Sequence, residues 1–370
     1  MIYLDNGATT LIKPVSVGRA VSEAMRSMAS PGRGGHPPAM LAAETVYACR
    51  EAAAELFNVP EPEQVVFTMN ATHALNIAIN SLARAGERVV VSGFEHNSVT
   101  RPLTAKGAEL VYAGTKLFDA ADTLEDFDSK LKGAGLCVCT HVSNVFGYVL
   151  PIYEIAELCR RRSVPLIVDA SQSAGVLDVD MQKLDAEFIA MPGHKSLFGP
   201  QGTGILLCKN MAKPYMFGGS GSDSVPQHMP DYLPDGLEAG THNVCGIAGL
   251  LAGINYVRAT GTGNILRHEQ RLLKTMVSEL DGSGAELFTG PGQSGVLSLR
   301  VKGMDCEQVA EGLSQRGICV RSGMHCAPTA HRSAGTLDTG TVRLSFSPFN
   351  DERQIKTACA AIREIAEKGK

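Results

Sequence analysis

The middle of the chain alternates short apolar runs with segments in which apolar residues recur at helical spacing. The runs are rich in β-branched residues, which is typical of strands, and they cover residues 64–68, 88–92, 136–142, 165–170, 187–191 and 204–208. Residues 71–82 and 152–162 show the helical spacing. Strands that alternate with helices predict βαβ units and a mostly parallel sheet.

The pattern changes from about residue 260. Residues 265–280 predict a long amphipathic helix, and residues 295–301 alternate like a half-buried strand of an antiparallel sheet. Residues 341–345 are similar. We therefore predict an α/β protein with two domains. The large domain, residues 15–250, contains the mostly parallel sheet, and residues 1–14 and 251–370 form a smaller α+β domain.

Composition excludes several classes of protein. The 370 residues carry a net charge of −4, which gives no basic surface for nucleic acid. No apolar run approaches the roughly 20 residues that span a membrane, and the start MIYLDN lacks the features of a signal peptide. We expect a cytoplasmic protein. Its ten cysteines are scattered without a C-x-x-C pair, so most should be free and buried.

Two residues at predicted strand ends point to cofactor chemistry. Lys195 follows the strand 187–191 in a Gly/Pro-rich segment, where open α/β sheets bind ligands and where burial would free the amine for imine chemistry. Asp169 ends the strand 165–170 and suits the pyridinium nitrogen of pyridoxal phosphate (PLP). The alternatives are a solvated lysine and an aspartate that caps a helix.

Three further junctions carry polar residues. Residues 68–74 join a strand to a helix whose N-terminus, with Thr72, would bind phosphate; capping by Asn70 or Thr72 is the alternative. His96 would stack on a cofactor ring or be structural, and Asn144 would bond a ring hydroxyl or shape a turn. Together, the five junctions suit one aromatic, phosphorylated, imine-forming cofactor better than five unrelated explanations do.

Segments along most of the chain resemble those of a known family. The sequence is similar to the class V aminotransferase superfamily, and within it to the cysteine desulfurase and selenocysteine lyase branch. The matching segments are LDNGATT (4–10), NATHALN (70–76), EHNS (95–98), HVSNVFG (141–147), VDASQSAG (168–175), GHKSLFGPQG (193–202), EAGTHN (238–243) and RSGMHCAP (321–328). The resemblance implies a PLP-dependent transferase of fold type I that acts as a homodimer.

The resemblance also implies residue roles. Those at the cofactor are Lys195 for the covalent link, Asp169 for the ring nitrogen, His96 for stacking, Asn144 and Gln172 for the ring hydroxyl, Thr72, His73 and His194 for the phosphate, and Thr241 for the phosphate of the partner subunit. Arg343, with Asn144, would bind the substrate carboxylate. Pro192 and Ala71 stand where many relatives have hydroxyl residues, so fewer hydroxyls would hold the phosphate here.

Cys326 is the residue that indicates which branch of the family the sequence resembles. It matches the family's RSG-x-HCA pattern, and a flexible loop there would bring a thiolate to the substrate. A protonated His325 would lower the pKa of the thiol. The alternatives are an inert cysteine or a metal site, but the spacing of Cys319, His325, Cys326 and His331 matches no standard zinc pattern, so we expect no metal.

The predicted function is that of a PLP-dependent cysteine desulfurase. It would convert L-cysteine to L-alanine and leave the sulfur on Cys326 as a persulfide, with Lys195 and His96 also catalytic and a sulfur-acceptor protein as a possible partner. The alternatives are a selenocysteine lyase acting on L-selenocysteine, or a cysteine/cystine lyase. A class V aminotransferase is disfavoured by Cys326, and a non-catalytic PLP-binding protein by the presence of Lys195, Asp169 and His96.

Overall fold

The computed structural model describes residues 1–32 and 34–368. Its helices are α1 (Val15–Ser27), α2 (Pro37–Phe57), the 3₁₀ turn η1 (Pro62–Gln64), α3 (Ala71–Leu82), α4 (Asn97–Ala105), α5 (Ala120–Lys130), α6 (Ile152–Arg161), α7 (Met181–Leu184), α8 (Val244–Thr260), α9 (Thr262–Leu280), α10 (Cys306–Ser314), α11 (Pro328–Ser333) and α12 (Glu352–Lys368). Its strands are β1 (Ile2–Tyr3), β2 (Val65–Thr68), β3 (Arg88–Ser92), β4 (Glu109–Ala113), β5 (Leu136–Thr140), β6 (Leu166–Asp169), β7 (Phe188–Pro192), β8 (Gly204–Cys208), β9 (Ala285–Phe288), β10 (Val296–Val301), β11 (Ile318–Cys319), β12 (Arg321–Gly323) and β13 (Thr341–Ser345).

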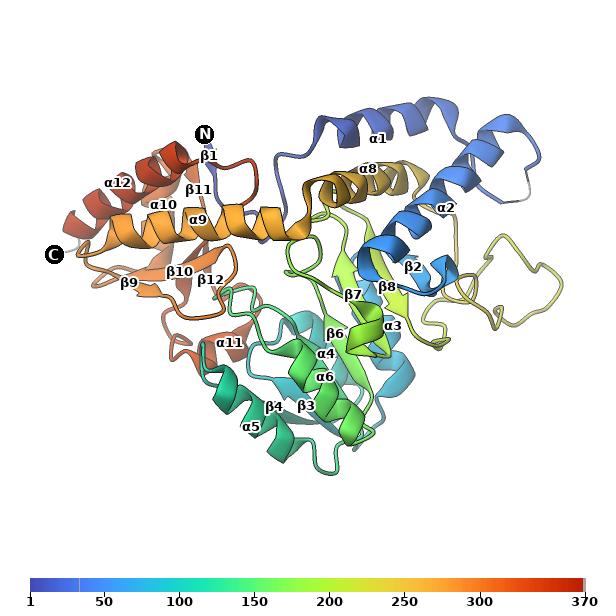
Figure 1. The fold of residues 1–370 in the computed structure, drawn as a ribbon, viewed down its shortest axis with the longest axis horizontal. Helices are drawn as coiled ribbons and strands as arrows, with labels where there is room; N and C mark the ends of the chain where they lie inside the picture. The colour runs from blue at the N-terminus through green and yellow to red at the C-terminus, as the bar shows by residue number, and fades with distance from the viewer. Residues whose placement is uncertain (33, 369–370) are drawn as a thin grey trace.

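A seven-stranded sheet forms the larger part of the molecule (Figure 1). Its order is β2-β8-β7-β6-β5-β3-β4, and β8 alone runs antiparallel to its neighbours. The predicted mostly parallel sheet is therefore confirmed, and the six strands expected from the sequence all lie in it. The edge strand β4 has a partly exposed pattern, and it was not among the strands expected from the sequence.

Both faces of this sheet are covered by helices, which explains why its strands read as continuous apolar runs. In β5, Leu136 and Val138 belong to the core beneath α3 and α4. The alternate residues Cys137 and Cys139 belong to the opposite core, which also takes residues from α2, α6 and α8. These two cysteines therefore share one buried face of the strand, as the expectation of mostly buried cysteines implies.

The C-terminal part packs around a four-stranded antiparallel sheet, β12-β13-β10-β9, with α9, α10 and α12. The chain start joins it, since β1 pairs with β11 and Leu4 lies in the same core. The predicted helix 265–280 begins earlier, at residue 262, directly after Gly261, whose φ of +82° allows the break between α8 and α9. Figure 1 shows α9 reaching from this part to the end of α8. The domain limits given above stay a prediction.

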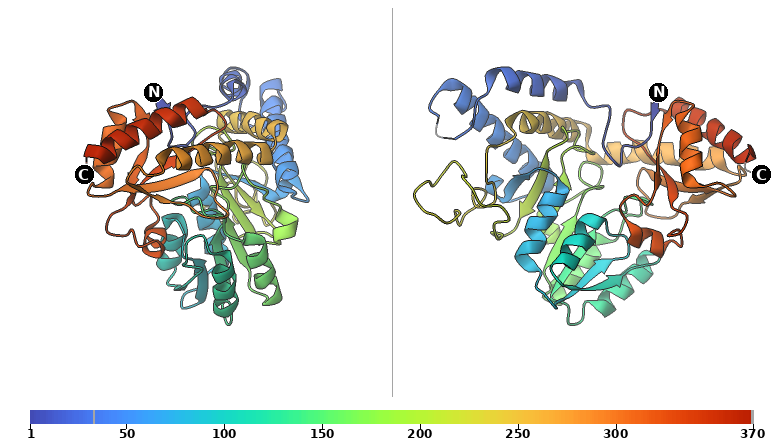
Figure 2. Two further views of the ribbon diagram at one scale, coloured as in Figure 1. Left: turned by 60° about the vertical axis from the view of Figure 1, so that its left-hand side comes forward. Right: turned by 180° about the vertical axis from the view of Figure 1, so that it is seen from behind.

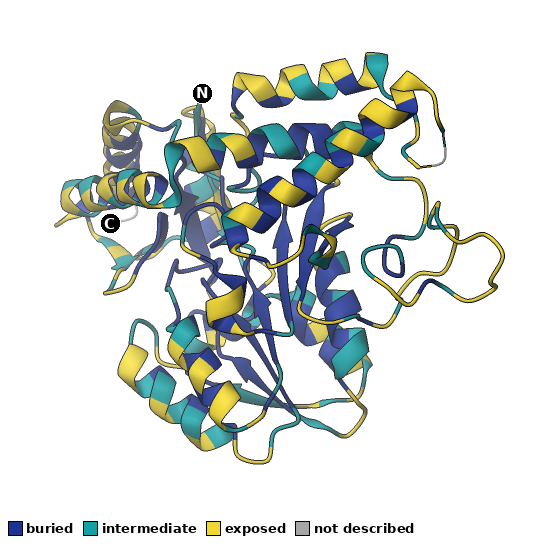
Figure 3. Ribbon diagram, turned by 45° about the vertical axis from the view of Figure 1, so that its right-hand side comes forward, coloured by how far each residue is buried: buried dark blue, intermediate teal, exposed yellow. Residues whose placement is uncertain are grey.

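The carboxyl ends of the parallel strands meet at one edge of the sheet, as the buried strands in Figure 3 show. There the chain leaves β2, β3, β5, β6 and β7, the five junctions that the sequence singles out. A long segment between β8 and α8 projects from the same body (Figure 2) and exposes Tyr215, Phe217 and Val225. Within residues 1–32 and 34–368, none of the helices combines the length and the apolar character that crossing a bilayer requires.

Candidate active site

A cavity of about 230 Å³ lies at this edge, between the strand ends and the C-terminal sheet, and is called the Lys195 cavity below. It brings together most of the residues that the sequence predicts for the site: Thr72, His96, Asn144, Asp169, Gln172, His194, Lys195, Cys326 and Arg343. His73 and Thr241 do not line it.

Lys195 and Asp169 come from neighbouring strands. Lys195 is half-buried just after β7, and burial lowers the pKa of its amine to about 8 while Asp169 acts in the opposite direction. Asp169 is 2% exposed, and its Oδ1 accepts a hydrogen bond from the N–H of Ser171 at 2.9 Å. No helix begins at this junction, since the next one, α7, starts at residue 181. Asp169 is therefore not a helix cap, and a carboxylate lies at the base of the cavity.

An N-terminal segment, residues 9–13, fixes the backbone that carries Lys195. The hydroxyl of Thr10 donates to the carbonyl oxygens of His194 (3.1 Å) and Lys195 (3.2 Å), and the amine of Lys13 donates to that hydroxyl at 2.8 Å. Thr9 Oγ1 lies 3.0 Å from His194 Nδ1. Burial, followed by Lys195 and Lys13, lowers the pKa of His194 to about 4, so its imidazole faces the cavity uncharged.

His96 and Thr72 meet through Ser98. His96 caps α4 by accepting from the N–H of Ser98 at 3.1 Å, and Thr72 Oγ1 lies 2.8 Å from Ser98 Oγ. Burial lowers the pKa of His96 to about 4 against the influence of Asp169. The cavity wall therefore presents a neutral, flat imidazole. Ser98 lies in the EHNS segment, but its role depends on this contact and has no signal of its own in the sequence.

The start of α3 serves as both cap and cavity wall. Asn70 Oδ1 accepts from the N–H of His73 at 2.9 Å, which is a helix cap. The following residues, Ala71 and Thr72, line the cavity. The ring of His73 points elsewhere, because its Nδ1 accepts from the N–H of Met69 at 3.3 Å. The structure therefore does not bring the His73 side chain to the predicted phosphate site.

Two amide side chains are held by the backbone around them. Asn144 Nδ2 donates to the carbonyl of His325 at 2.8 Å, and Gln172 Nε2 donates to the carbonyl of Gly7 at 3.0 Å. Both residues line the cavity. Their amide groups are fixed at its wall, while the ring hydroxyl as their partner remains a prediction.

Cys326 lies in a tight turn between β12 and α11, and the flexibility expected of this segment stays a prediction. The turn is closed by the bond from Ala327 N–H to the Met324 carbonyl at 2.9 Å, and both central residues have positive φ, 49° for His325 and 57° for Cys326. These values define a type I′ turn. The Cys326 carbonyl also accepts from Asn97 N–H at 2.8 Å. All ten cysteines lie among the described residues, and Cys326 alone is exposed.

His325 cannot act as the predicted cation beside this thiol. Its side chain is buried, and burial, followed by the charge of Arg343, lowers its pKa to about 2. Its Nε2 lies 3.2 Å from both the carbonyl and the hydroxyl oxygen of Thr341, and its ring stacks on His331 at 5.7 Å between centroids. The expectation that a protonated His325 lowers the pKa of the thiol is therefore wrong, because the imidazole stays neutral.

Arg343 is buried and already paired. Its Nη2 donates to Asp5 Oδ1 at 2.6 Å and its Nη1 to the Asn144 carbonyl at 3.0 Å, with 2% of the residue exposed. Burial lowers the pKa of its guanidinium, while Asp5 raises it. Asp5, in the LDNGATT segment, is a site residue for which the sequence suggested no role, because its partner lies 338 residues away.

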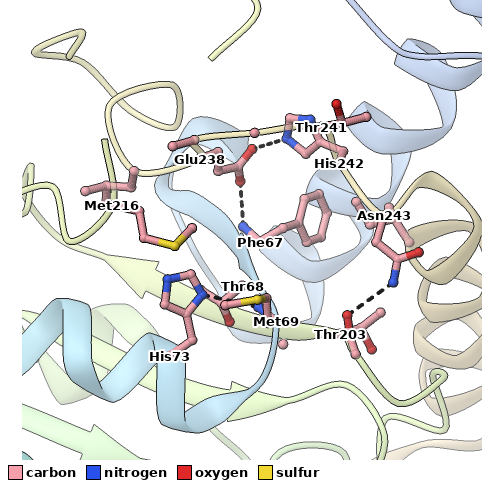
Figure 4. A pocket seen from close by; sticks show the side chains of 16 residues that line it. Phe67, Thr68, Met69, His73, Thr203, Met216, Glu238, Thr241, His242 and Asn243 are labelled. Carbon is pink, nitrogen blue, oxygen red and sulfur yellow. Dashed lines mark hydrogen bonds and ion pairs between the residues drawn. The ribbon is translucent and has the colours of Figure 1, made fainter. Parts of the chain in front are cut away.

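A second cavity, of about 180 Å³, contains both residues that the first does not (Figure 4). We call it the Glu238 cavity. His73 and Thr241 line it, together with Glu238 and His242. Glu238 pairs with the buried Arg50 and also bonds His242. These contacts hold the segment that carries Thr241, which is an exposed residue.

Comparisons with known proteins show the family and the fold of the chain. The family model described as aminotransferase class-V matches residues 2–357. A probable cysteine desulfurase from Methanothermobacter thermautotrophicus is 34% identical, with 100% of this chain and 95% of that protein covered. The solved apo cysteine desulfurase from Thermococcus onnurineus is 32% identical, with a TM-score of 0.92 and coverage of 99% and 95%. A cysteine desulfurase from Escherichia coli, solved in an S-sulfonic acid form, is 25% identical, with a TM-score of 0.85 and coverage of 99% and 94%.

Proposed function

The chain belongs to the class-V aminotransferase family, and from that premise we propose that it is a PLP-dependent cysteine desulfurase. The observation that carries the proposal is the exposed Cys326 on the wall of a cavity that also contains Lys195 and Asp169. Relatives that match over nearly the whole chain are named cysteine desulfurases. The reaction would convert L-cysteine to L-alanine and leave the sulfur on the enzyme.

The donor set of the Lys195 cavity fits PLP. An amine with a pKa of about 8 suits a covalent link to an aldehyde. The buried carboxylate of Asp169, bonded through Oδ1 to Ser171, suits a protonated ring nitrogen. The neutral His96 ring suits a flat partner, and the start of α3 with Thr72 suits a phosphate. PLP, when bound, supplies an electron sink for the carbanion at the substrate Cα.

The remaining chemistry belongs to the chain's own residues. Asp169 would keep the ring nitrogen of the cofactor protonated. Lys195, which is uncharged in part near neutral pH, takes and returns the proton at the substrate Cα. Asn144 is fixed by its bond to the His325 carbonyl, so it can orient the substrate without rearranging.

Cys326 performs the sulfur transfer. Its thiolate attacks the sulfur of the bound substrate, an S–S bond forms, and the Cβ–S bond breaks with its electron pair going to the substrate carbon. A proton then completes the methyl group of alanine. Overall, L-cysteine and one thiol give L-alanine and one persulfide, so no external oxidant or reductant is needed. The backbone of the turn that carries this thiol is bonded at Asn97 and closed at Ala327.

The proposal includes a homodimer with shared sites. Thr241 does not line the Lys195 cavity of its own chain, and it is an exposed residue close to the Arg50–Glu238 ion pair, which supports a role in the site of the partner subunit. The exposed Tyr215 and Phe217 in the projecting segment offer apolar surface for such a contact. A heterodimer of one Lys195→Ala and one Thr241→Ala subunit should contain one intact site and bind PLP more tightly there than the Thr241→Ala homodimer does. An active monomer in sedimentation would contradict this arrangement. A sulfur-acceptor protein and a cytoplasmic location remain predictions from the sequence.

Product analysis tests the proposal against its alternatives. Purified protein loaded with PLP and given L-cysteine should release alanine in step with protein-bound sulfur, and later sulfide when a thiol reductant is added. Pyruvate with ammonia would indicate a lyase, and a keto acid with an aminated cofactor would indicate an aminotransferase. Cys326→Ala should keep PLP but release no alanine from L-cysteine. If it keeps activity on L-selenocysteine, the selenocysteine lyase alternative gains weight.

A further inference from the structure

Two buried imidazole rings lie behind the turn that carries Cys326. The rings of His325 and His331 stack with 5.7 Å between their centroids and 25° between their planes, and the two residues are 5% and 0% exposed. His325 precedes Cys326 directly and lines the Lys195 cavity, whereas His331 lies on α11 and does not line that cavity. His331 can therefore act on the cavity only through His325.

A chain of hydroxyl groups fixes the edge of the His325 ring. The Ser298 hydroxyl donates to the Val145 carbonyl at 2.7 Å, and the Thr341 hydroxyl donates to Ser298 Oγ at 3.2 Å. Each hydroxyl has a single proton, so Thr341 Oγ1, which lies 3.2 Å from His325 Nε2, can only accept from that nitrogen. His325 thus carries its proton on Nε2, and this bond orients the ring.

The second ring is fixed from the end of its own helix. His331 Nδ1 lies 2.7 Å from Thr336 Oγ1, and the His331 carbonyl accepts from the Thr336 N–H at 2.8 Å. Phe146 packs against the same ring in a T-shaped arrangement, with 5.8 Å between centroids. The His331 ring is therefore held from two directions in the position where its face covers the face of His325.

Core filling alone does not account for this pair of histidines. His325 Nδ1 and His331 Nε2 are buried and have no hydrogen-bond partner within residues 1–32 and 34–368. A buried nitrogen without a partner costs free energy, which an apolar side chain of similar size would avoid. This cost is offset only if the bonded nitrogens and the stacked faces hold something in place.

The segment in front of the rings has an unfavourable backbone conformation. His325 and Cys326 have φ of 49° and 57°, which residues other than glycine rarely adopt and which persists only where the surroundings enforce it. The Cys326 side chain is exposed, so the side-chain support comes from His325, held at its edge by Thr341 and on its face by His331. Burial lowers the pKa of His331 to about 4, against the Met324 backbone at the start of the turn, so the stacked rings are uncharged and do not repel each other.

We propose that His331 is a positioning residue for the sulfur-transfer step. By stacking on His325, it holds the turn in the conformation that places the Cys326 thiol at the wall of the Lys195 cavity. This inference rests on the proposed function and deepens it, because it gives α11 a role in presenting the nucleophile without any contact to the substrate. Loss of the stacked ring should slow sulfur transfer and leave the binding of amino acid and cofactor unchanged.

Steady-state kinetics of the PLP-loaded enzyme separate presentation of the thiol from binding. His331→Ala should lower kcat for L-cysteine about tenfold to a hundredfold, with KM little changed, because a small misplacement of a reacting group is costly. His331→Phe, which keeps a flat ring, should recover much of this loss. Thr336→Val removes only the partner of Nδ1 and should have a smaller effect than His331→Ala. The matched control is Met276→Ala, which removes a fully buried side chain from α9 in the core of the small sheet and should keep kcat.

Hydrogen exchange gives a second readout that needs no turnover. The Ala327 N–H is bonded to the Met324 carbonyl and the Asn97 N–H to the Cys326 carbonyl. Both should exchange about tenfold faster in His331→Ala than in wild type or Met276→Ala, because the turn opens more often.

The outcomes separate the two proposals. The role of His331 would be overturned by unchanged exchange in His331→Ala, by a loss of kcat no greater than in Met276→Ala, or by a His331→Phe variant no better than His331→Ala. If wild type releases no alanine from L-cysteine, the desulfurase proposal fails, and the exchange rates still decide whether His331 holds the turn.

Discussion

The two cavities of this chain differ in whether their polar groups already have hydrogen-bond partners within the protein. In the Glu238 cavity every polar atom of the carboxylate is used: Oε1 accepts from Arg50 at 2.8 Å and from the Phe67 N–H at 2.6 Å, and Oε2 bonds Arg50 and His242. In the Lys195 cavity, the amine of Lys195, the thiol of Cys326 and the guanidinium of Arg321 have no side-chain partner among the described residues. Polar groups that are fully bonded build structure, whereas groups held in place but left unbonded are available for chemistry.

The same contrast appears in the charges. Burial alone would raise the pKa of Glu238, but Arg50 and His242 reverse the effect and keep it ionised. Burial of Lys195 is only partly opposed by Asp169, so the pKa of its amine stays low, at about 8. Neutralising a charge should therefore lower stability in the Glu238 cavity and lower activity in the Lys195 cavity.

The largest effect is expected at Asp169. If Asp169 has the proposed role, Asp169→Asn removes the charge that keeps the cofactor nitrogen protonated, so kcat should fall about a hundredfold or more while the fold is kept. Alanine release from L-cysteine and the unfolding midpoint measure the two quantities. The control is Asp178→Asn, whose side chain is 72% exposed. Near-normal turnover of Asp169→Asn would mean that Asp169 has only a structural role.

A smaller effect, on stability, is expected at Glu238. Glu238→Gln leaves Arg50 buried without its counter-charge, and the free energy of unfolding should fall by about 3–5 kcal/mol. Glu286→Gln removes an ion pair to Arg300 whose acid is 56% exposed, and it should cost less than about 1 kcal/mol. Denaturant titrations of both variants give the comparison. Equal losses would show that the Glu238 cluster is no more than a surface pair.

The smallest effect concerns Glu95, which is buried behind His96. Burial raises the pKa of its carboxyl group to about 8, against bonds from Ser92 and the Thr140 N–H. The folded protein thus keeps a proton that the unfolded chain releases above the ordinary glutamate pKa of 4.5. This contribution to stability is complete below that pH and is lost as the pH rises toward about 8, by at most about 1.4 kcal/mol per pH unit.

Glu95→Gln should remove this part of the pH dependence. Unfolding free energies at pH 6 and pH 8, at equal cofactor occupancy, should change less in the variant than in wild type. The exposed Glu44→Gln is the control and should follow wild type. A variant that keeps the full slope would show that Glu95 is ionised in the folded protein.

The sequence predicted the parts of the site that depend on local order along the chain. A buried strand followed by a polar residue located Asp169, Lys195, His96 and Asn144, because parallel strands bring their carboxyl ends to one edge. It also identified Cys326 through the segment that surrounds it, although the thiol lies on a tight turn. Strand β4 was missed because its half-exposed pattern is weak.

Most features of the site that the sequence did not predict depend on contacts between residues far apart along the chain. Asp5 and Arg343 are separated by 338 positions, and Arg50 and Glu238 by 188, and no periodicity reports such pairs. The neutral state of His325 follows from burial against Thr341 and from the charge of Arg343. The direction of the His73 ring differs in that a local bond, from the N–H of Met69, decides it, and the spacing of the residues gives no signal of that bond. These features needed the tertiary structure.

The location of the transferred sulfur distinguishes a persulfide on Cys326 from every other route. PLP-loaded protein is given L-cysteine without reductant, alkylated, digested and examined by mass spectrometry, with Cys326→Ala treated in parallel. We expect the peptide containing Cys326 to gain one sulfur atom, in step with the alanine released, and the variant to gain none. Sulfur on another cysteine, or alanine released with Cys326 unmodified and the variant fully active, would contradict this expectation.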